Sequence, residues 1–400
     1  MLGFTAKIVG CFGFVGLYAF YYGYGDTFGY YEAATEIRQI FLNDPSTIVK
    51  TIFSTTLDRK FQNEIGIDIF DGLYANSANY TVVRFALVFG IFTFNSYLAS
   101  SLFFAFTSFI GIWALYRVVA HIFPYQYKSV TIPILYIPSV FFWGSSMMKD
   151  SIVIGFLGLL TYAIYWLFFQ KKNIFLSFVL VVVSVYFLGI VKQYVIIAYI
   201  PALVLWLCLG PLNRLPSKER WIALPFFLVV GLIVIAALFP FLEKASQRYT
   251  LETVLQTAET TANYIHRTTP EGGSSYTLGV VSYTPLGMVV VFPRAVTVSL
   301  FQPFLYEVRN PVMLLSAFES LVFLLGTLFI IFRVGLFRFV GFILNHPFLL
   351  MCLMFSIFFA FAIGISTYNY GSLARYKIPA LPFYGIALII PYMLNRSRNH

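Results

Sequence analysis

The sequence predicts an all-α polytopic membrane protein with about ten transmembrane helices. Its 400 residues are 60% hydrophobic and only 10% charged, and the mean hydropathy is +0.82. Soluble globular domains do not have this balance. Ten apolar segments each approach the roughly 20 residues that a helix needs to cross a bilayer. We therefore expect a single transmembrane domain over residues 1–400, with no separate soluble domain.

The predicted spans follow one another along the chain at 7–24, 96–117, 129–147, 152–169, 174–191, 194–212, 221–241, 312–332, 346–366 and 378–394. We interpret the first as an uncleaved span, because no small-residue cleavage site follows it. A further apolar segment, 80–94, is short for a span and is typical of a re-entrant or interfacial helix. The alternative is that it crosses, so we expect about 10 to 12 helices.

Basic residues at the ends of the predicted spans set the topology, with the N- and C-termini in the cytoplasm. The cations on that side are Lys7, Arg117, Lys128, Lys171, Lys172, Arg214, Lys218, Arg220, Arg333, Arg338, Arg396 and Arg398. Because the net charge of +10 is scattered in this way, it indicates membrane topology and no nucleic-acid partner.

Two long loops, 25–95 and 242–311, are then expected on the outer side. The first contains eight of the sixteen acidic residues, all within 25–79, and opens with an amphipathic helix on the membrane surface. The apolar residues of this helix have helical spacing: Ala34, Ile37, Ile40 and Phe41.

The second outer loop is predicted to begin with a polar helix through Glu252 and Glu259, followed by a flexible hinge at 270–275. The stretch 288–306 is expected to lie against the membrane, broken by its two prolines, Pro293 and Pro303. The three cysteines are isolated inside apolar runs, which favours neither a disulfide framework nor a zinc site. Nucleotide-binding and serine-hydrolase motifs are absent from the sequence.

The most informative feature of the sequence is a charged elbow, the short connection between two predicted spans that contains the adjacent residues Lys149 and Asp150. The third span ends in Gly144-Ser145-Ser146, and Lys149 and Asp150 follow directly before the next apolar run. Ionisable groups at the edge of the hydrocarbon are costly unless paired or hydrated, so they indicate a functional site. The alternative is a solvated turn.

Other charged or polar residues occur at predicted outer ends of spans, where the positive-inside trend disfavours cations. They are Asp26, Lys192, Gln193, Arg294, Glu307, Arg309, Arg375 and Lys377. An anionic ligand with a phosphate would offset these cations. Alternatively, each cation snorkels to lipid head groups.

The sequence leaves two possible roles open for each of two acidic residues, Asp26 and Glu319. Asp26 follows the first span between glycines, where it would act as a general base or as an Asx-turn or N-cap of the next helix. Glu319 lies inside the eighth predicted span, so it should face the protein interior and find a partner. It would be a hydrogen-bond anchor or part of a transport path.

The layout resembles the GT-C class of membrane glycosyltransferases, which use polyprenyl-phosphate-linked sugars. The residues that carry the resemblance are 25–34 (GDTFGYYEAA), 138–150 (PSVFFWGSSMMKD), 301–311 (FQPFLYEVRNP) and 369–382 (NYGSLARYKIPALP). The resemblance implies a GT-C-like fold and sugar transfer, with inversion, to a lipid- or glycan-linked acceptor at the extracytoplasmic face. It also implies a bacterial inner-membrane location within cell-envelope polysaccharide biosynthesis.

The same resemblance implies roles for individual residues. Asp26 would be the base and Asp150 a second acid that positions the acceptor or a divalent metal, Mg or Mn. The donor phosphate would be bound by Lys149, Lys192, Arg294, Arg309, Arg375 and Lys377. Acceptor or supporting contacts would come from Glu32, Gln193, Glu307 and Tyr376. Many members carry a pair of acids in the first loop, whereas here Thr27 follows Asp26.

Two other functions fit the same span count and outer cations. One is an O-antigen or other surface-polysaccharide polymerase. The other is a transporter or flippase of a lipid-linked saccharide, for which we expect half-chain repeats or broken helices at the membrane midplane. No such repeat is evident in the sequence.

Overall fold

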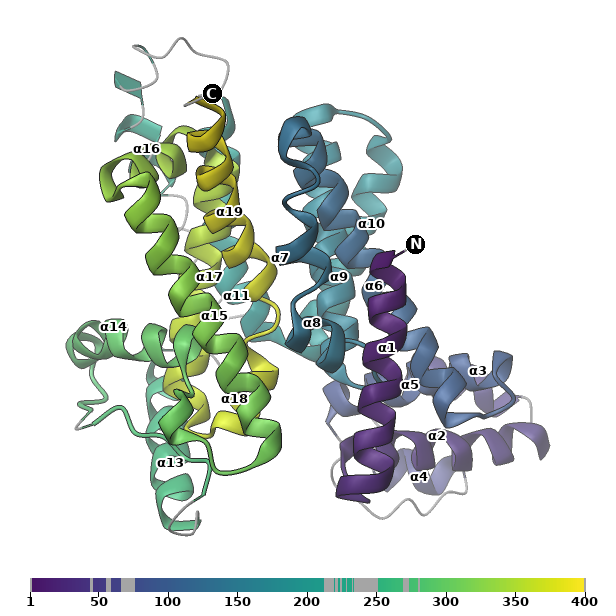
Figure 1. Cartoon of the computed structure of the whole chain (residues 1–400). Coiled ribbons are helices and arrows are strands. Elements are labelled where there is room, and N and C mark those ends of the chain that lie inside the picture. Colours follow the sequence, from purple (N-terminus) through teal and green to yellow (C-terminus); the bar gives the residue numbers. More distant parts are fainter. Residues whose placement is uncertain are drawn as a thin grey trace. The chain divides into compact units, whose positions relative to one another are not determined.

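The fold is known from a computed structural model that describes residues 2–43, 46–54, 59–65, 76–211, 219, 222–223, 225–227, 229–231, 233, 251–268, 273–279 and 281–398. Over these residues the chain is almost entirely helical (Figure 1). The only β pairing described is a single bridge between Ser275 and Asn369. The predicted all-α class is therefore confirmed for this part of the chain.

Six helices are long and apolar enough to cross a membrane, and each coincides with a predicted span. They are α1 with its π-helical end η1 (Leu2–Tyr22), α6 (Tyr97–Ile122), α9 with η4 (Lys149–Gln170), α10 (Ile174–Val191), α15 (Pro311–Val334) and α17 (Pro347–Thr367). These apolar helices make the chain a polytopic membrane protein.

Three of the other four predicted spans differ from the expectation of long straight helices. The segment 129–147 is two short helices, α7 (Thr131–Leu135) and α8 (Pro138–Trp143), and 194–212 is the 17-residue α11 (Gln193–Leu209). The last is the bent pair α18 (Tyr370–Tyr376) and α19 (Leu381–Arg398), which would be a seventh span with a 66° bend. The segment 221–241 lies largely outside the described residues.

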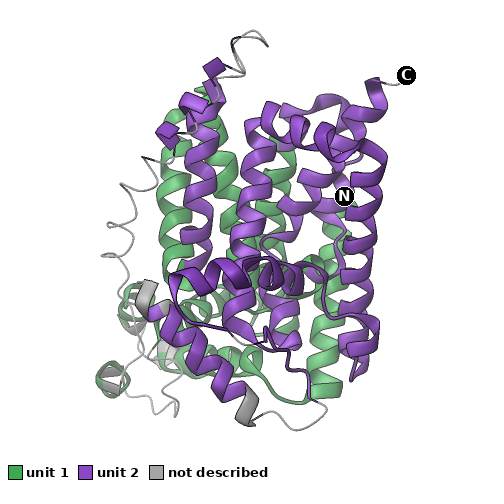
Figure 2. Ribbon diagram, turned by 90° about the vertical axis from the view of Figure 1, so that its left-hand side faces the viewer, with its two compact units in different colours: residues 1–118, 140–193 green, residues 119–139, 194–400 purple. Residues whose placement is uncertain are grey.

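Contacts divide the chain into two compact units (Figure 2). Unit 1 comprises Met1–Val118 and Val140–Gln193, and unit 2 comprises Val119–Ser139 and Tyr194–His400. Both contain candidate spans. The prediction of a single transmembrane domain with outer loops 25–95 and 242–311 stays a prediction.

The backbones of α6 and α9 approach each other closely within unit 1. A Cβ atom added to Gly111 of α6 would overlap the backbone of Gly155 on α9, and one added to Gly158 would overlap Gly111. Membrane helices use small residues in this way because their association depends on packing more than on water exclusion.

We expect Gly111→Ala to destabilise the protein by about 1–3 kcal/mol, because the added methyl must push two packed helices apart. The measurement is the midpoint of thermal unfolding of the detergent-solubilised chain. Gly16→Ala in α1 is the matched control, since a Cβ there meets no described atom within 4 Å. Equal midpoints for the two variants would contradict the close packing.

The first of the two predicted outer loops begins with α2 (Asp26–Asn43), which runs crosswise to α1 in Figure 1. Its buried apolar face contains Tyr30, Ala33, Ala34 and Ile37. This face packs on α5 (Ser77–Phe92), and the Tyr30 hydroxyl donates to Asn79 Oδ1 at 2.9 Å. The predicted helix exists, and this part of its apolar face covers α5. Its position along the membrane surface stays a prediction.

α5 is the helix of the ambiguous segment 80–94, and it is 16 residues long. Arg84 on it donates to the carbonyls of Ile52 and Ser54, at the end of α3 (Ser46–Phe53). The interpretation of α5 as a re-entrant or interfacial helix that does not cross the membrane stays a prediction. The remaining helix described in this loop is α4 (Arg59–Ile65).

In unit 2, α14 (Pro285–Phe301) packs tightly on α17: Ser299 Oγ donates to the Ala360 carbonyl at 2.6 Å. The predicted break at Pro293 is wrong, because α14 continues through it. A proline removes one helical hydrogen bond, and neighbouring helices can compensate for that loss in a membrane. The helix does end two residues before Pro303, as expected.

The predicted polar helix of the second loop is α13 (Leu251–Thr268), which packs on α17. Its buried residues, Leu255, Ala258 and Ala262, lie on one face. The short helix α16 (Leu336–Asn345) connects α15 to α17. Short 3-10 turns, η3 (Pro124–Gln126) and η7 (Leu305–Glu307), complete the described elements.

Candidate functional site

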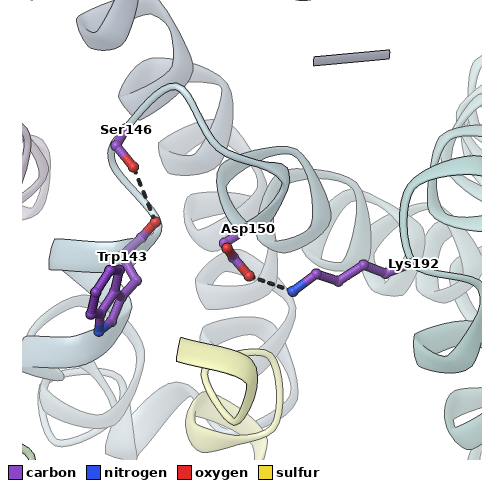
Figure 3. Close-up of polar contacts among 4 residues, drawn as sticks. All are labelled: Trp143, Ser146, Asp150 and Lys192. Carbon is purple, nitrogen blue, oxygen red and sulfur yellow. Dashed lines mark hydrogen bonds and ion pairs between the residues drawn. The ribbon is translucent and has the colours of Figure 1, made fainter. Parts of the chain in front are cut away.

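The charged elbow predicted from the sequence contains a buried ion pair. Asp150, in the first turn of α9, accepts a hydrogen bond from Lys192 Nζ at 2.5 Å (Figure 3). The exposed fractions of the two side chains are 0% and 5%. Two charges at this depth must neutralise each other. The pair therefore joins the start of α9 to the end of α10.

Local backbone geometry places Asp150 there. The helix α8 ends at Trp143, and a short loop follows it. The Ser151 hydroxyl donates to the Ser146 carbonyl of this loop at 2.7 Å and accepts a hydrogen bond from the Ser146 amide. This loop directs α9 to begin at Lys149. A carboxylate in the first turn is also favoured by the positive end of the helix dipole.

Lys7, on α1, is a third buried charged residue among the described residues of unit 1. Its ammonium donates to Ser108 Oγ at 2.8 Å, to the Val140 carbonyl at 3.0 Å and to the Gly144 carbonyl at 2.8 Å. An ammonium has three protons, so three acceptors satisfy it. The side chain is buried and connects α1 to the loop before Asp150. The predicted role of Lys7 as a cytoplasmic topology signal stays a prediction.

Asp26, the predicted base, is the first residue of α2, and its side chain is exposed. Glu32, one and a half turns later, is also exposed. Gly25 has φ 143 and accepts from the Phe28 amide at 3.0 Å, so the tight turn expected before the helix is present. The predicted role of Asp26 as a base stays a prediction.

In unit 2, Lys377 lies between α18 and α19 and is 1% exposed. Its ammonium donates to Ser320 Oγ at 2.8 Å and lies 3.5 Å from the Gln302 carbonyl oxygen. These contacts hold the α18–α19 bend against α15. The predicted phosphate contact of Lys377 would compete with these internal bonds and stays a prediction.

Glu319 on α15 has the interior position that the sequence predicted. It is 7% exposed, and its Oε2 accepts from the Ser139 amide at 2.7 Å. Glu319 Oε1 and the Ser139 hydroxyl have no hydrogen-bond partner among the described residues. Lys377 attracts this carboxylate at longer range. The expected partner is therefore confirmed, and one carboxylate oxygen remains for a further contact.

Glu307 connects the loop after α14 to α18. Its Oε2 accepts from the Phe304 amide at 2.7 Å, and its Oε1 accepts from the Tyr370 hydroxyl at 2.6 Å. The Gln302 side-chain amide lies 2.9 Å from the same hydroxyl. Glu307 is therefore a structural anchor, and its predicted contact with an acceptor would have to use the same oxygens.

Four other predicted site residues of unit 2 lie nearer the surface. Arg294 and Arg309 are exposed, and Arg294 donates to the Thr277 carbonyl at 3.1 Å. Arg375 and Tyr376 are half-buried, with the guanidinium carbon 5.9 Å from the centroid of the tyrosine ring. The predicted phosphate contacts of these arginines stay predictions.

Tyrosines surround the bridge at Ser275. The rings of Tyr276 and Tyr368 stack with centroids 5.7 Å apart, and the Tyr276 hydroxyl donates to the Gly364 carbonyl at 2.8 Å. Burial raises the pKa of Tyr276 and of Tyr368, so both hydroxyls stay protonated at neutral pH. This packing fixes the chain that leads from the second loop into α14.

We expect Lys377→Met to lower stability by about 1–3 kcal/mol, because the substitution leaves Ser320, the Gln302 carbonyl and Glu319 without their cation. Arg375→Gln, two residues earlier and half-buried, should change the unfolding midpoint little and weaken binding of a polyprenyl-phosphate sugar instead. The two measurements are thermal unfolding and equilibrium binding of the labelled lipid. The opposite pattern would make Lys377 the ligand contact.

The structure brings Asp150 and Lys192 together, with Lys149 beside them and Gln193 next to Lys192 in the chain. The site predicted from the sequence also requires residues of unit 2, so its convergence stays a prediction. In the described part of the chain, no three His, Cys, Asp or Glu side chains form a group that could hold a metal ion. A site for Mg or Mn at Asp26 and Asp150 stays a prediction.

Sequence reasoning missed several buried polar contacts. Lys7 and Arg84 both lie inside apolar runs, and that depth was itself a signal that each must find acceptors. Ser139, Gln302 and Ser320 carry no such signal, because hydroxyls and amides are common in membrane helices.

The comparisons with known proteins add no relative. No family model matches the chain, and neither a curated protein nor a solved structure is significantly similar to it.

Proposed function

We propose that the protein is a membrane glycosyltransferase that moves a sugar from a polyprenyl-phosphate donor to a lipid- or glycan-linked acceptor. The observation that supports this most is the Asp150–Lys192 pair, buried at the start of a membrane helix beside Lys149. Charged groups at such a position are costly and typical of a functional site. The GT-C resemblance supplies the reaction class.

In the proposed reaction, Asp26 takes the proton of an acceptor hydroxyl. The hydroxyl oxygen forms a bond to the anomeric carbon of the sugar as the bond from that carbon to the donor phosphate oxygen breaks. The bonding electrons leave with the phosphate, and inversion follows from attack on the opposite face. General-base assistance of this kind contributes typically 10²- to 10⁴-fold.

The leaving polyprenyl phosphate gains negative charge, which cations stabilise most strongly at a site shielded from water. Lys149 is half-buried and is the cation of unit 1 best placed for this role. Lys192 is held by Asp150, which fixes the direction of its ammonium. In unit 2, Arg294, Arg309 and Arg375 would contribute, and a divalent metal would bind at Asp26 and Asp150 if the reaction uses one.

We further propose a bacterial inner-membrane location with both termini in the cytoplasm and the site at the extracytoplasmic face. Cysteine labelling at positions 26, 149 and 375 from each side of the membrane tests this orientation. Labelling of all three from the outer side is expected. Labelling of any one of them only from the cytoplasm would remove the shared site.

The deciding experiment is transfer of radiolabel from a polyprenyl-phosphate sugar to glycan and lipid acceptors by the purified chain. Labelled product that depends on the protein supports the proposal. Elongation of polyprenyl-pyrophosphate oligosaccharides would assign a polysaccharide polymerase instead. Tight donor binding with translocation across vesicles and no transfer would assign a flippase, the alternative favoured by the buried Glu319 within α15.

A further inference from the structure

Exposed arginines gather at one end of unit 2. Arg333 lies at the end of α15, Arg338 in α16, and Arg396 and Arg398 in the last turn of α19. The three helices contact one another there, and the Arg398 guanidinium lies 5.0 Å from the centroid of the Phe342 ring on α16. Figure 1 shows α16 close to the C-terminus of α19.

These arginines have no acidic residue on the same part of the chain. The sequence contains no Asp or Glu after Glu319, so α16, α17, α18, α19 and most of α15 carry no carboxylate side chain. The nearest acid on α15 is Glu319 itself, which is buried and bonded to Ser139. The end of unit 2 therefore presents a positive surface whose own helices supply no negative partner.

The helix α16 combines this charge with an exposed apolar face. Its ten residues span about 15 Å, too short to cross a bilayer. Phe339, Phe342 and Ile343 are buried against unit 2, whereas Leu336, Phe337 and Val340 are 56%, 92% and 43% exposed. The turn into the helix is made by Gly335 with φ 84, a conformation that a glycine adopts without strain.

We propose that this end of unit 2 binds anionic phospholipid. α16 lies in the interfacial layer with Phe337 among the acyl chains, and Arg333, Arg338 and Arg398 bind the lipid phosphates. A short helix with one apolar face and arginines beside it is typical of helices that lie in a bilayer interface. One guanidinium group can donate two parallel hydrogen bonds to the oxygens of one phosphate. Each basic residue near the surface adds about 1 kcal/mol of attraction to an anionic membrane.

This inference does not depend on sugar transfer. It assigns a lipid headgroup to cations that the proposed reaction does not use. A failure of the lipid experiment would leave the glycosyltransferase proposal unchanged, and the reverse also holds.

The test is binding of phosphatidylglycerol and phosphatidylcholine to the full chain in detergent, measured by native mass spectrometry. The variant is Arg333→Gln/Arg338→Gln/Arg398→Gln. The control, Lys50→Gln/Lys60→Gln/Lys172→Gln, removes the same charge from three exposed lysines of unit 1. We expect about fivefold weaker phosphatidylglycerol binding per arginine, on the order of 100-fold for the triple variant. Phosphatidylcholine binding should not change, and the control should bind phosphatidylglycerol like the unmodified chain.

Equal loss of phosphatidylglycerol binding in both triple variants would overturn the proposal, since it would reduce the effect to net charge. Undiminished binding in the arginine variant would overturn it as well. A second measurement addresses depth: the fluorescence added by Phe337→Trp should be quenched by acyl-chain-brominated lipid in nanodiscs. The fluorescence added by Tyr264→Trp, on the exposed polar side of α13, should be quenched much less. Quenching of the Phe337→Trp variant that is as weak as the quenching expected at position 264 would place α16 outside the interface and overturn the proposal.

Discussion

Asp26→Asn should lower the rate of sugar transfer by 10²- to 10⁴-fold, the contribution expected of a positioned general base. The amide keeps the shape of the side chain but cannot take the proton of the acceptor hydroxyl. Because Asp26 is exposed at the start of α2, the substitution should not unfold the protein. The measurement is kcat/KM with the donor at saturation, together with the midpoint of thermal unfolding.

Two substitutions control this result. Glu32→Gln removes another exposed acid of α2 and should leave the rate within a fewfold of that of the unmodified protein. Asp26→Glu retains a base at a longer reach and should recover part of the activity. A rate that is indifferent to Asp26→Asn would remove the mechanism while leaving the possibility of transfer by another base.

Breaking the Asp150–Lys192 pair should cost about 3–5 kcal/mol of stability, because either single substitution leaves a buried charge without its counter-ion. Asp150→Asn and Lys192→Met should each lower the unfolding midpoint strongly. The double variant, in which no charge is left, should recover most of the loss. The double-mutant cycle measures this coupling directly.

Lys149→Met is the matched control, since Lys149 is adjacent in the chain but half-buried. It should change stability little and reduce the rate of transfer through loss of phosphate stabilisation. Independent, additive effects of Asp150→Asn and Lys192→Met would contradict the ion pair. Activities of these variants are to be expressed per folded molecule, because a destabilised preparation would otherwise imitate a catalytic defect.

Hydropathy predicted the six long helices because each is a continuous apolar run of membrane-spanning length. Hydropathy predicted helix lengths less well where one continuous apolar run contains a break between two helices. Composition cannot distinguish one long helix from α7 followed by α8, although Pro138 at the start of α8 is a helix-breaking signal. At Pro293 the same signal misled, because the helix continues through it.

Part of the candidate site could be predicted from residue type alone. The interior position of Glu319 followed from the cost of an acid within a span, and the structure confirms it. The partner of Asp150 could not be predicted, since Lys192 is 42 residues later and the pairing depends on how α9 and α10 pack. The burial of Lys377 also depends on helix packing: the sequence placed this residue at the outer end of a predicted span, and its side chain lies inside unit 2.

The bonds of Lys7 also constrain the order in which the chain can assemble during synthesis. Its three acceptors follow it by 101, 133 and 137 residues. At about 5–20 residues per second, roughly 7 to 27 seconds pass between the emergence of the first helix and that of its last partner. During that interval the ammonium must be shielded by water or by the insertion machinery, so the nascent first helix should remain beside the translocon until residue 144 has entered the bilayer.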